Sequence, residues 1–390
     1  MHIMVVPSWY SSPSNIVHGS FFKEQFKALQ KSGEKITVAY NEIWPITMLG
    51  RGCQKRGISF EIEEGLRTYR YKDYNFLPKN SNMFHIFNRR MEKLYLEILE
   101  KEGRVDVIHA HSAFWGGIAA AYVAKKYNIP FVLTEHSSLR YSKYVQKGYV
   151  RWIKNAYDSA DSLIAVGNGL KNEMKEYTDN TIEVIHNMVD FTLFKSMPIE
   201  KDSNKIELFS LSFLVEEKGM DLLINAFNKV FKGENVILRI GGDGYLRESL
   251  EALVKQFDLQ NQITFLGALD RLQVAYEMNR CDGFVLASEH ETFGAVYTEA
   301  LAVGRPILGT FNGGAEDIVK DYNGIIVENK NIEKLSEGLI RFVEELPNYN
   351  SEEIKTKCIE QYSEEIIINK IKKIYEIIKG ENIWNLESIK

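Results

Sequence analysis

Apolar segments of strand length alternate with amphipathic helical segments along the whole of this 390-residue sequence, in two successive series. The first series has expected strands at residues 2–6, 36–39, 106–110, 131–134, 162–166 and 182–185, with helical patterns that include 20–32 and 114–127. The second has expected strands at residues 206–212, 236–241, 262–266, 283–287, 306–309 and 325–327, with helical patterns that include 219–232 and 245–257. Two such series predict an α/β chain with two doubly wound, Rossmann-like parallel sheets that face a cleft between domains.

The division between the two series is expected in the polar segment 195–205, which has the composition of a linker. Residues 1–195 would then form an N-terminal domain and residues 196–363 a C-terminal domain. A last helix is expected over about 364–390, with Ser363 as its N-cap. A length of 390 residues with 45% hydrophobic composition is ample for two cores.

The formal charge is divided unevenly, because residues 1–195 carry +6 and residues 196–390 carry −11, which leaves −5 overall. An acidic protein is a poor binder of nucleic acid, whereas the basic half suits an anionic partner. Basic side chains mix with aromatic and aliphatic ones at 44–56 and 140–154, a mixture that favours an anionic membrane surface or a lipid diphosphate. The alternative is that both segments are solvated helix faces above an aromatic core stripe.

The cysteines and the N-terminus favour a cytoplasmic chain. Cys53, Cys281 and Cys358 lie far apart without a CxxC pair, so neither a zinc site nor a disulfide framework is indicated. The N-terminus lacks the basic region of a signal peptide, and no segment approaches the roughly 20 apolar residues of a membrane span. We therefore expect a cytoplasmic protein, with weak peripheral contact at the inner face of the cytoplasmic membrane as a hypothesis.

Glu291 and Glu299 flank a Phe-Gly step, in a segment where a strand is expected to end near Ala287 and a helix to begin near Gly294. The backbone N–H groups of residues 294–296 would then point at one spot beside the positive end of the helix dipole, a geometry that binds phosphate. Carboxylates accept hydrogen bonds from hydroxyl groups, so the pair suits a ligand that is part phosphate and part sugar. The alternative is a surface helix with two solvated glutamates.

The segment resembles the signature of glycosyltransferase family 4, whose members are retaining enzymes of the GT-B fold. The family pattern is Glu-x-Phe-Gly, then four residues, then Glu-Ala-x-Ala-x-Gly-x-Pro, and residues 291–294 and 299–306 match it. The resemblance implies that Glu291 contacts hydroxyls of the transferred sugar and that Glu299 binds the ribose. It implies that sugar and diphosphate lie against the backbone of Phe293, Gly294, Ala295 and Val296. The resemblance also implies that the chain after Ser363 crosses back onto the N-terminal domain. It is weakest between residues 40 and 104.

The same resemblance assigns a cation to the diphosphate. Lys218-Gly219 and the helix after them match a family segment whose lysine neutralises the donor diphosphate as charge grows on the leaving group. Phe213 stands where the family has an arginine, and Ser212 where it has a glycine. A second cation would then have to come from elsewhere in the sequence, for which Arg140 and Arg247 are candidates.

Further donor contacts are implied around two other strands. Gly242 and Gly244 lie in a loop that resembles the family's glycine loop beside the nucleotide, although a strand-to-helix turn would also explain them. Leu266 and Ala268 lie at the end of the next strand, where the family places the base. The turn at residues 312–314 resembles a family turn that packs beneath the site, and we interpret it as structural.

The N-terminal half is expected to supply the acceptor side. His109 and His111 lie at the end of the strand expected over 106–110, and we expect their side chains to point to opposite faces, so that only one faces the cleft. Resemblance to the family pattern Asp-x-Ile-His-x-His, which begins here at Asp106, selects His111 as the residue near the reacting sugar and leaves His109 internal. A structural histidine is the alternative.

Two loops of this half complete the expected site. Gly19 and Ser20 open a helix and are placed like the family's glycine loop, which contacts the donor phosphate or the acceptor. Glu135 and His136 follow an expected strand and are candidates for the border of the acceptor pocket. A loop pair that has no part in the chemistry is an equal alternative for the last two.

Together the motifs imply a retaining hexosyltransferase that transfers a hexose from a nucleotide-diphosphate sugar, with a UDP-sugar expected, to a glycan or lipid-linked acceptor. The expected setting is bacterial surface polysaccharide synthesis. No DxD-type carboxylate pair stands beside the motifs, and a helix N-terminus with Lys218 can hold a diphosphate without a metal, so neither a metal nor another cofactor is expected. Two alternatives remain, namely a UDP-sugar 2-epimerase of the same fold and a non-catalytic sugar-nucleotide-binding subunit.

Overall fold

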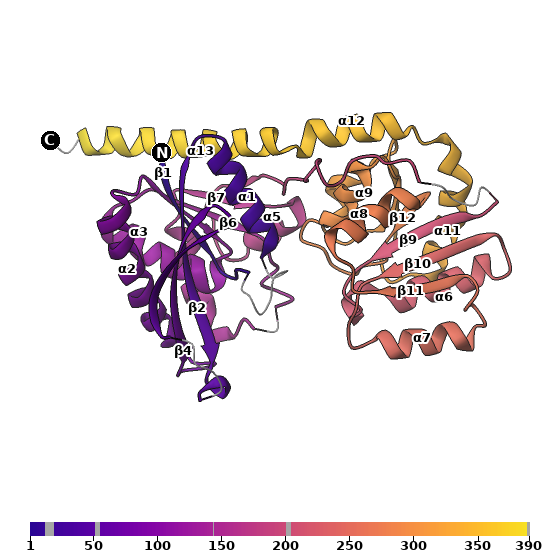
Figure 1. Ribbon diagram of the computed structural model, residues 1–390, viewed down its shortest axis with the longest axis horizontal. Helices are drawn as coiled ribbons and strands as arrows, with labels where there is room; N and C mark the ends of the chain where they lie inside the picture. The colour runs from indigo at the N-terminus through magenta and orange to yellow at the C-terminus, as the bar shows by residue number, and fades with distance from the viewer. Residues whose placement is uncertain (12–18, 51–54, 143, 200–203, 388–390) are drawn as a thin grey trace. The chain divides into compact units, whose positions relative to one another are not determined.

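The computed structural model describes residues 1–11, 19–50, 55–142, 144–199 and 204–387 (Figure 1). The chain forms two compact units. The first unit consists of Met1–Val166, Leu170–Ile185 and Ile367–Lys390, and the second consists of Gly167–Gly169 and His186–Ile366. Cys53 and residues 200–203 of the expected linker lie outside the described residues.

The first unit contains a sheet in which the described strands follow the order β3-β4-β2-β1-β5-β6-β7-β8. Every neighbouring pair is parallel except β3 and β4, which form an antiparallel hairpin at one edge. All strands that the sequence predicts for this half are present, whereas β3 and β4 were not predicted. The bounds are β1 His2–Pro7, β2 Lys35–Pro45, β3 Gly57–Glu63, β4 Leu66–Asn75, β5 Val107–His111, β6 Phe131–Glu135, β7 Ser162–Ala165 and β8 Ile182–Val184.

Helices connect these strands and end the chain. The helix expected over 114–127 is regular only from Ile118, because Phe114 and Trp115 have non-helical backbone angles and Trp115 has a φ of +75°. The last helix begins at Glu364, directly after Ser363, as expected. The helical segments are α1 Ser20–Lys31, η1 Ile46–Met48, α2 Met83–Glu102, η2 Ala113–Gly117, α3 Ile118–Tyr127, η3 Lys147–Tyr149, α4 Val150–Asp158, α5 Asn168–Met174 and α13 Glu364–Glu387.

The second unit contains a wholly parallel sheet whose strands follow the order β11-β10-β9-β12-β13-β14. Each of these strands was predicted from the sequence. The strand bounds are β9 Ile206–Leu211, β10 Val236–Gly241, β11 Ile263–Gly267, β12 Gly283–Val285, β13 Ile307–Thr310 and β14 Gly324–Val327. The helical segments are η4 Glu216–Lys218, α6 Met220–Phe231, α7 Arg247–Gln256, α8 Arg271–Arg280, α9 Ala295–Ala302, α10 Ala315–Ile318, α11 Ile332–Glu345, η5 Leu346–Asn348 and α12 Ser351–Tyr362.

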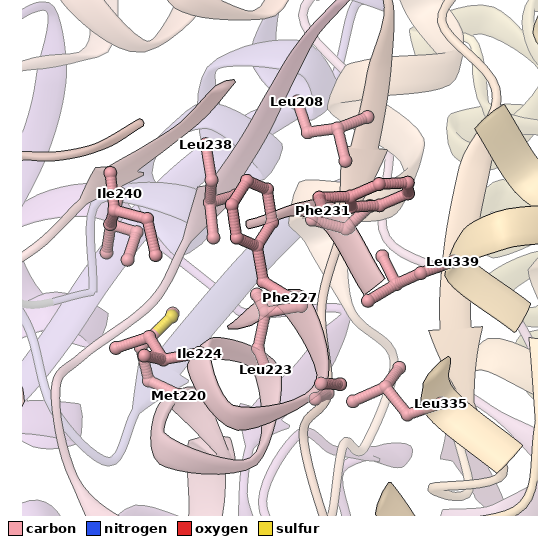
Figure 2. Close-up of a cluster of buried hydrophobic side chains, with 14 of the residues drawn as sticks. Leu208, Met220, Leu223, Ile224, Phe227, Phe231, Leu238, Ile240, Leu335 and Leu339 are labelled. Carbon is pink, nitrogen blue, oxygen red and sulfur yellow. The ribbon is translucent and has the colours of Figure 1, made fainter. Parts of the chain in front are cut away.

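Helix α6 shows how the sequence period builds the core of the second unit. Its apolar residues recur at helical spacing, so they form one face that packs against β9, β10 and α11 (Figure 2). Burial of each large apolar side chain contributes about 1.5–3 kcal/mol. The face consists of Met220, Leu223, Ile224, Phe227 and Phe231, and its partners include Leu208, Leu238, Ile240, Leu335 and Leu339. In the part of the chain that the structure describes, none of the helices combines the length and the apolar character needed to cross a bilayer.

Candidate functional site

Lys218 and Glu291 come from different loops of the second unit, and their side chains meet. Lys218 Nζ donates a hydrogen bond to Glu291 Oε1 at 2.6 Å, and both side chains are partly buried. Lys218 ends the short helix η4, whereas Glu291 lies between β12 and α9. An ammonium group beside a carboxylate can bind an anion and a hydroxyl group side by side, because the first donates and the second accepts hydrogen bonds.

The loop that carries Lys218 is fixed against the segment that follows β12. The backbone oxygen of Glu217 accepts a hydrogen bond from the N–H of Glu289 at 2.8 Å. Gly219 has a φ of +58°, and a Cβ atom at this position would lie 2.2 Å from the backbone oxygen of Ala287. Only glycine fits so close an approach in this backbone conformation. The neighbouring Lys218 is therefore held in place by backbone packing.

Helix α9 begins one residue after the sequence predicts. Gly294 caps it with a φ of +88°, and a Cβ atom at Gly294 would lie 2.5 Å from the ring of Tyr297. The first two helical residues are Ala295, which is exposed, and Val296, which is partly buried. The N–H groups of the first helical turn lack partners within the helix and carry the positive end of its dipole. This end of α9 is suited to an anion.

The turn at residues 312–314 packs directly beneath this segment. The N–H of Glu291 donates a hydrogen bond to the backbone oxygen of Asn312 at 2.9 Å. A Cβ atom at Gly314 would lie 2.4 Å from the backbone oxygen of Phe293. The Phe293 side chain is buried and stacks on His186, with the ring centres 5.4 Å apart. Phe293 thus anchors the loop inside the unit, and its buried ring is not exposed to a ligand.

Glu299 lies on α9, beyond its first turn, and contacts a residue that the motifs did not indicate. Its Oε1 atom lies 3.7 Å from Nη1 of Arg271, the first residue of α8. The guanidinium group of Arg271 also lies over the ring of Phe194, at 5.5 Å from its centre. The sequence could have indicated Arg271, because it lies soon after Ala268, where the resemblance places the base. An arginine here places positive charge next to the carboxylate expected to bind ribose.

Gly242 and Gly244 lie against the chain that follows β9. A Cβ atom at Gly242 would lie 1.8 Å from the backbone oxygen of Ser212, and one at Gly244 would lie 2.3 Å from that of Leu214. Backbone packing therefore requires both glycines whether or not a ligand is bound. The side chain of Phe213 is 73% exposed. An aromatic ring in solvent thus occupies the position where the family resemblance predicts an arginine.

The remaining donor candidates lie around β11. Leu266 is partly buried within that strand, and Ala268 is exposed just after it. Arg247 lies close by, because a Cβ atom at Gly267 would be 3.2 Å from its Nη1 atom. Arg140, the other candidate cation, belongs to the first unit and forms an ion pair there with a glutamate that follows α5. Arg247 is therefore the candidate that the second unit itself provides.

His109 and His111 lie on the same face of β5, which corrects the prediction that they point to opposite faces. Their ring centres are 4.3 Å apart, because residues i and i+2 of a strand share a face. His109 contacts the Thr134 hydroxyl at 2.8 Å, and His111 Nδ1 lies 3.1 Å from His136 Nε2. Burial lowers the pKa of His109 to about 3. Burial, with smaller effects from His109 and His136, lowers the pKa of His111 well below its ordinary value, so both rings are neutral.

The selected residue, His111, is also fully buried. The rings of Phe22 and Phe26 pack against it, with centres 5.2 and 5.0 Å away. Its Nε2 atom is buried and has no hydrogen-bond partner among the described residues. A buried polar atom without a partner is uncommon in folded proteins. His111 therefore combines an internal position with one unused hydrogen-bonding group.

Glu135 is held inside the first unit by a full set of hydrogen bonds. Its carboxylate accepts from the N–H groups of Ala113, His136 and Ser137 at 2.9, 3.0 and 3.2 Å, and from the Tyr157 hydroxyl at 2.9 Å. The side chain is fully buried. These bonds tie the end of β6 to the turn after β5. A structural role explains Glu135 without any ligand.

Gly19 and Ser20 begin α1, as the sequence predicts. Gly19 has a φ of +76°, and a Cβ atom there would lie 2.8 Å from the backbone oxygen of Trp9. The start of α1 is therefore packed against the chain that leaves β1. Residues 12–18 of the preceding loop lie outside the described residues.

Within each unit, the predicted residues lie at or after the carboxyl ends of parallel strands. In the second unit they follow β9, β10, β11 and β12, and in the first they follow β1, β5 and β6. Ligands of doubly wound sheets bind at this end of the strands. The structure brings Lys218 to Glu291 in the second unit and His111 to His136 in the first.

Both halves of the sequence match models of known protein families. The model described as Glycosyltransferase Family 4 matches residues 19–193, and the model described as Glycosyl transferases group 1 matches residues 192–362.

Curated relatives and solved structures agree with these matches. The uncharacterized glycosyltransferase MJ1178 of Methanocaldococcus jannaschii is 32% identical over 73% of this chain and 78% of the relative. The putative teichuronic acid biosynthesis glycosyltransferase TuaC of Bacillus subtilis is 26% identical over 88% of this chain and 90% of the relative. The structure of Anabaena HepE in complex with UDP and glucose has a TM-score of 0.72 at 18% identity, over 96% of this chain and 99% of that one. The fold is the GT-B fold of glycosyltransferases, as the resemblance implied.

Proposed function

The chain belongs to glycosyltransferase family 4, and on this basis we propose that it is a retaining hexosyltransferase. The proposed donor is a UDP-sugar. The proposed acceptor is a hydroxyl group of a glycan or of a lipid-linked sugar, in the synthesis of a bacterial surface polysaccharide.

The observation that carries the proposal is the contact between Lys218 and Glu291 beside the start of α9. The helix N-terminus and the ammonium group supply positive charge for a diphosphate, and the carboxylate supplies an acceptor for sugar hydroxyls. Glu299 lies farther along the same helix, and we assign it to the ribose. The second unit thus offers complementary groups for the diphosphate, the sugar and the ribose.

The proposed chemistry keeps the sugar on one face of the site. The bond between the anomeric carbon and the diphosphate oxygen breaks while the acceptor oxygen bonds to the same face of that carbon. The acceptor proton passes to the departing phosphate oxygen. Lys218 and the N–H groups of α9 counter the charge that grows on the diphosphate, so we propose that no metal is needed. A glycosyl adduct trapped on Glu291 would contradict this mechanism.

Two relatives support the choice of donor and acceptor. HepE, with the same fold, was solved with UDP-glucose, and TuaC is described as a teichuronic acid biosynthesis enzyme. A panel of UDP-, GDP- and ADP-sugars tests the donor, because a ligand that binds the native state raises the melting temperature by mass action. Stabilisation by a UDP-sugar and not by the others is the expected result. Stabilisation by a GDP- or ADP-sugar alone would overturn the UDP assignment.

Substitutions of the two glutamates should affect different properties, namely nucleotide affinity for Glu299 and turnover for Glu291. Glu299→Ala removes a charge-assisted hydrogen bond to the nucleotide, so the Kd for UDP should rise on the order of tenfold. Glu291→Gln should leave that Kd nearly unchanged and lower turnover by about a hundredfold. Calorimetry with UDP and an assay of donor consumption measure both effects. Glu277→Ala is the control, because this buried carboxylate of the same unit pairs with Arg239, and it should change neither. Full activity in both site variants would refute the assignment.

An exposed apolar tip in the first unit supports a weak peripheral membrane contact. Ile46, Met48 and Leu49 are exposed in and after η1, at the end of β2. We propose that they enter the surface of an anionic bilayer, which would bring a lipid-linked acceptor within reach. Exchanging Met48 and Leu49 for serine should lower co-sedimentation with vesicles that contain phosphatidylglycerol. The same exchange at Ile359, an equally exposed residue of α12, should not.

One observation favours a second candidate function. The exposed ring of Phe213 leaves Lys218 without the arginine that the family pattern provides, which suits a subunit that binds a sugar nucleotide without turning it over. Tight UDP binding with no transfer and no donor hydrolysis would support that function. Phe213→Arg distinguishes the two, since an active enzyme should gain turnover from added charge, whereas a subunit without catalysis should show none in either form.

A further inference from the structure

Strand β3 forms one edge of the sheet in the first unit and carries an exposed apolar face. Ile58, Phe60 and Ile62 alternate along it, so they share one side of the strand, and all three are exposed. The guanidinium group of Arg67 lies over the Phe60 ring, at 5.0 Å from its centre. Leu96, on helix α2, is another exposed apolar residue of this unit.

The outer side of β3 is open among the described residues, because β4 is its one strand neighbour. Its pairing with β4 is regular over seven residues, from Gly57 opposite Lys72 to Glu63 opposite Leu66. Proteins usually protect such an edge with a bulge, a proline or an inward-pointing charge. β3 has neither a bulge nor a proline. Glu63 points inward, but the buried Arg70 compensates its charge at 2.7 Å, and the apolar residues of β3 are the exposed ones. An edge of this kind is a template for another strand.

The order of residues along β3 indicates which kind of strand can pair with its open edge. The segment from Lys55 to Glu64 reads KRGISFEIEE, so it is basic at its start, apolar in its centre and acidic at its end. An identical strand that runs antiparallel to it, with Phe60 opposite Phe60, places Ile58 opposite Ile62. It also brings Arg56, just before the strand, toward Glu64, which follows the strand in the hairpin turn. Apolar and opposite-charge pairs across antiparallel strands each contribute about 0.2–1 kcal/mol. The sequence is thus self-complementary about a two-fold axis at Phe60.

We propose that β3 is a dimerisation strand, which pairs with β3 of a second copy of this chain to join two sheets across a two-fold axis. The interface is isologous, so every contact occurs twice. This inference rests on the first unit alone and does not depend on the donor or the acceptor.

The charged ends of the strand remain available for this contact. Arg56 pairs with Asp73 through Nε at 2.6 Å, and its side chain is still 55% exposed. Glu64 pairs with Lys23 and Lys27, and its side chain is 59% exposed. A guanidinium has five N–H donors and a carboxylate has about four acceptor positions, so both groups can bind a further partner.

A lipid surface fits this face less well than a second copy does. Glu61, Glu63 and Glu64 stand at one end of the strand, and an anionic membrane would repel them. A second copy in antiparallel orientation places that acidic end beside the basic start at Lys55 and Arg56. The apolar tip at η1 is a separate feature at the other end of this hairpin.

Sedimentation velocity of the full chain tests the proposal at concentrations from about 1 to 50 µM, a range that brackets the micromolar Kd of a modest interface. The wild type should sediment as a dimer at the upper end, and Phe60→Glu should halve the mass. Ile340→Glu is the matched control, because Ile340 on α11 and Phe60 are both 42% exposed, and it should remain dimeric. A wild type that is monomeric throughout would overturn the proposal, as would a Phe60→Glu variant that stays dimeric.

A charge exchange tests the interface separately from folding, because misfolded variants would not recover a dimer when they are mixed. Arg56→Glu and Glu64→Arg should each be monomeric, since each places like charges opposite each other twice. An equimolar mixture of the two variants should recover the dimer, because the glutamate at 56 of one variant then faces the arginine at 64 of the other, and the second contact pairs the native Glu64 of the first with the native Arg56 of the second. Failure of the mixture to associate would refute the register. Co-sedimentation of the wild type with anionic vesicles that is lost in Phe60→Glu would instead assign this face to a membrane and overturn the dimer.

Discussion

At the scale of single residues, burial has its clearest consequence at the histidine pair on β5. His109 and His111 are neutral in the folded chain because burial lowers their pKa values, to about 3 for His109 and well below 6.5 for His111. In the unfolded chain each ring takes up a proton near pH 6.5. The unfolded state therefore binds more protons below that pH, so the free energy of unfolding falls as the pH falls.

We predict a loss of about 1.4 kcal/mol per pH unit for each of the two histidines below pH 6.5. Urea unfolding of the wild type at pH 7.5, 6.5 and 5.5, followed by circular dichroism, measures this slope. His111→Gln should make the slope between pH 6.5 and 5.5 shallower, because one of the rings whose pKa is lowered by folding is gone. Equal slopes for both proteins would show that His111 is not held neutral. Burial opposes ionisation of Glu102, but hydrogen bonds from Arg67 and Tyr69 lower its pKa to about 2, so this carboxylate titrates only at lower pH and does not contribute to this window.

The sequence motif supplied both histidines but not their environment. Their spacing was enough to place them on one face of the strand, and the opposite prediction was an error of geometry. Their burial could not be predicted in the same way, because Phe22 and Phe26 come from α1 and His136 follows β6. A motif records neighbours in sequence, whereas burial depends on side chains that arrive from other elements.

At the scale of elements, the junction between η4 and α6 shows how a glycine positions a charged side chain. Gly219→Ala should destabilise the chain, because the left-handed backbone costs about 1–2 kcal/mol and the new Cβ atom would clash with the backbone oxygen of Ala287. The clash should also displace Lys218 and lower the melting-temperature rise that UDP produces.

Gly233→Ala is the matched control for this prediction. Gly233 has a φ of +85°, and no atom lies within 4 Å of a Cβ atom built on it, so the variant pays only the backbone cost. Differential scanning fluorimetry with and without UDP compares the two variants. An equal loss of stability and an equal response to UDP would mean that close packing at Gly219 does not position the lysine.

The elements that the sequence did not reveal are as informative as those that it did. All of the strands predicted from apolar runs are present, but β3 and β4 were missed. The sequence of β4, LRTYRYKDYN, shows no regular alternation of apolar and polar residues. Some of its charged side chains instead form ion pairs with residues of neighbouring strands. Arg70 is buried on β4 because it bonds to Glu63 at 2.7 Å and to Glu42 at 3.0 Å. A strand whose side chains are satisfied by ion pairs with neighbouring strands cannot be recognised from its hydrophobic pattern.

At the scale of the whole molecule, the first unit depends on the last helix of the chain. Ile367, Ile371, Ile374 and Ile378 are buried at helical spacing along α13. Tyr375, on the same helix, contacts His109 Nδ1 through its hydroxyl at 2.5 Å. A residue near the C-terminus thus completes a hydrogen bond to the strand at the centre of the first sheet.

Tyr375→Phe should lower the stability of the first unit by about 1–3 kcal/mol, because it leaves a buried ring nitrogen of His109 without a partner. The affinity for UDP, which we assign to the second unit, should not change. Thermal unfolding and calorimetry measure the two effects. Tyr144→Phe, at an exposed tyrosine of the same unit, should change neither. A lowered UDP affinity in Tyr375→Phe would contradict the assignment of the donor to the second unit.

The return of the chain to its first unit also sets an order for biosynthesis. A ribosome releases β1 through β8 long before it releases α13, so the first sheet must wait for the second unit to be made before its apolar surface is covered. A chain cut before residue 367, by a premature stop or by a protease, would have every residue of the second unit up to Ile366 and an unfinished first unit. Completion of the first unit therefore requires synthesis of the whole second unit.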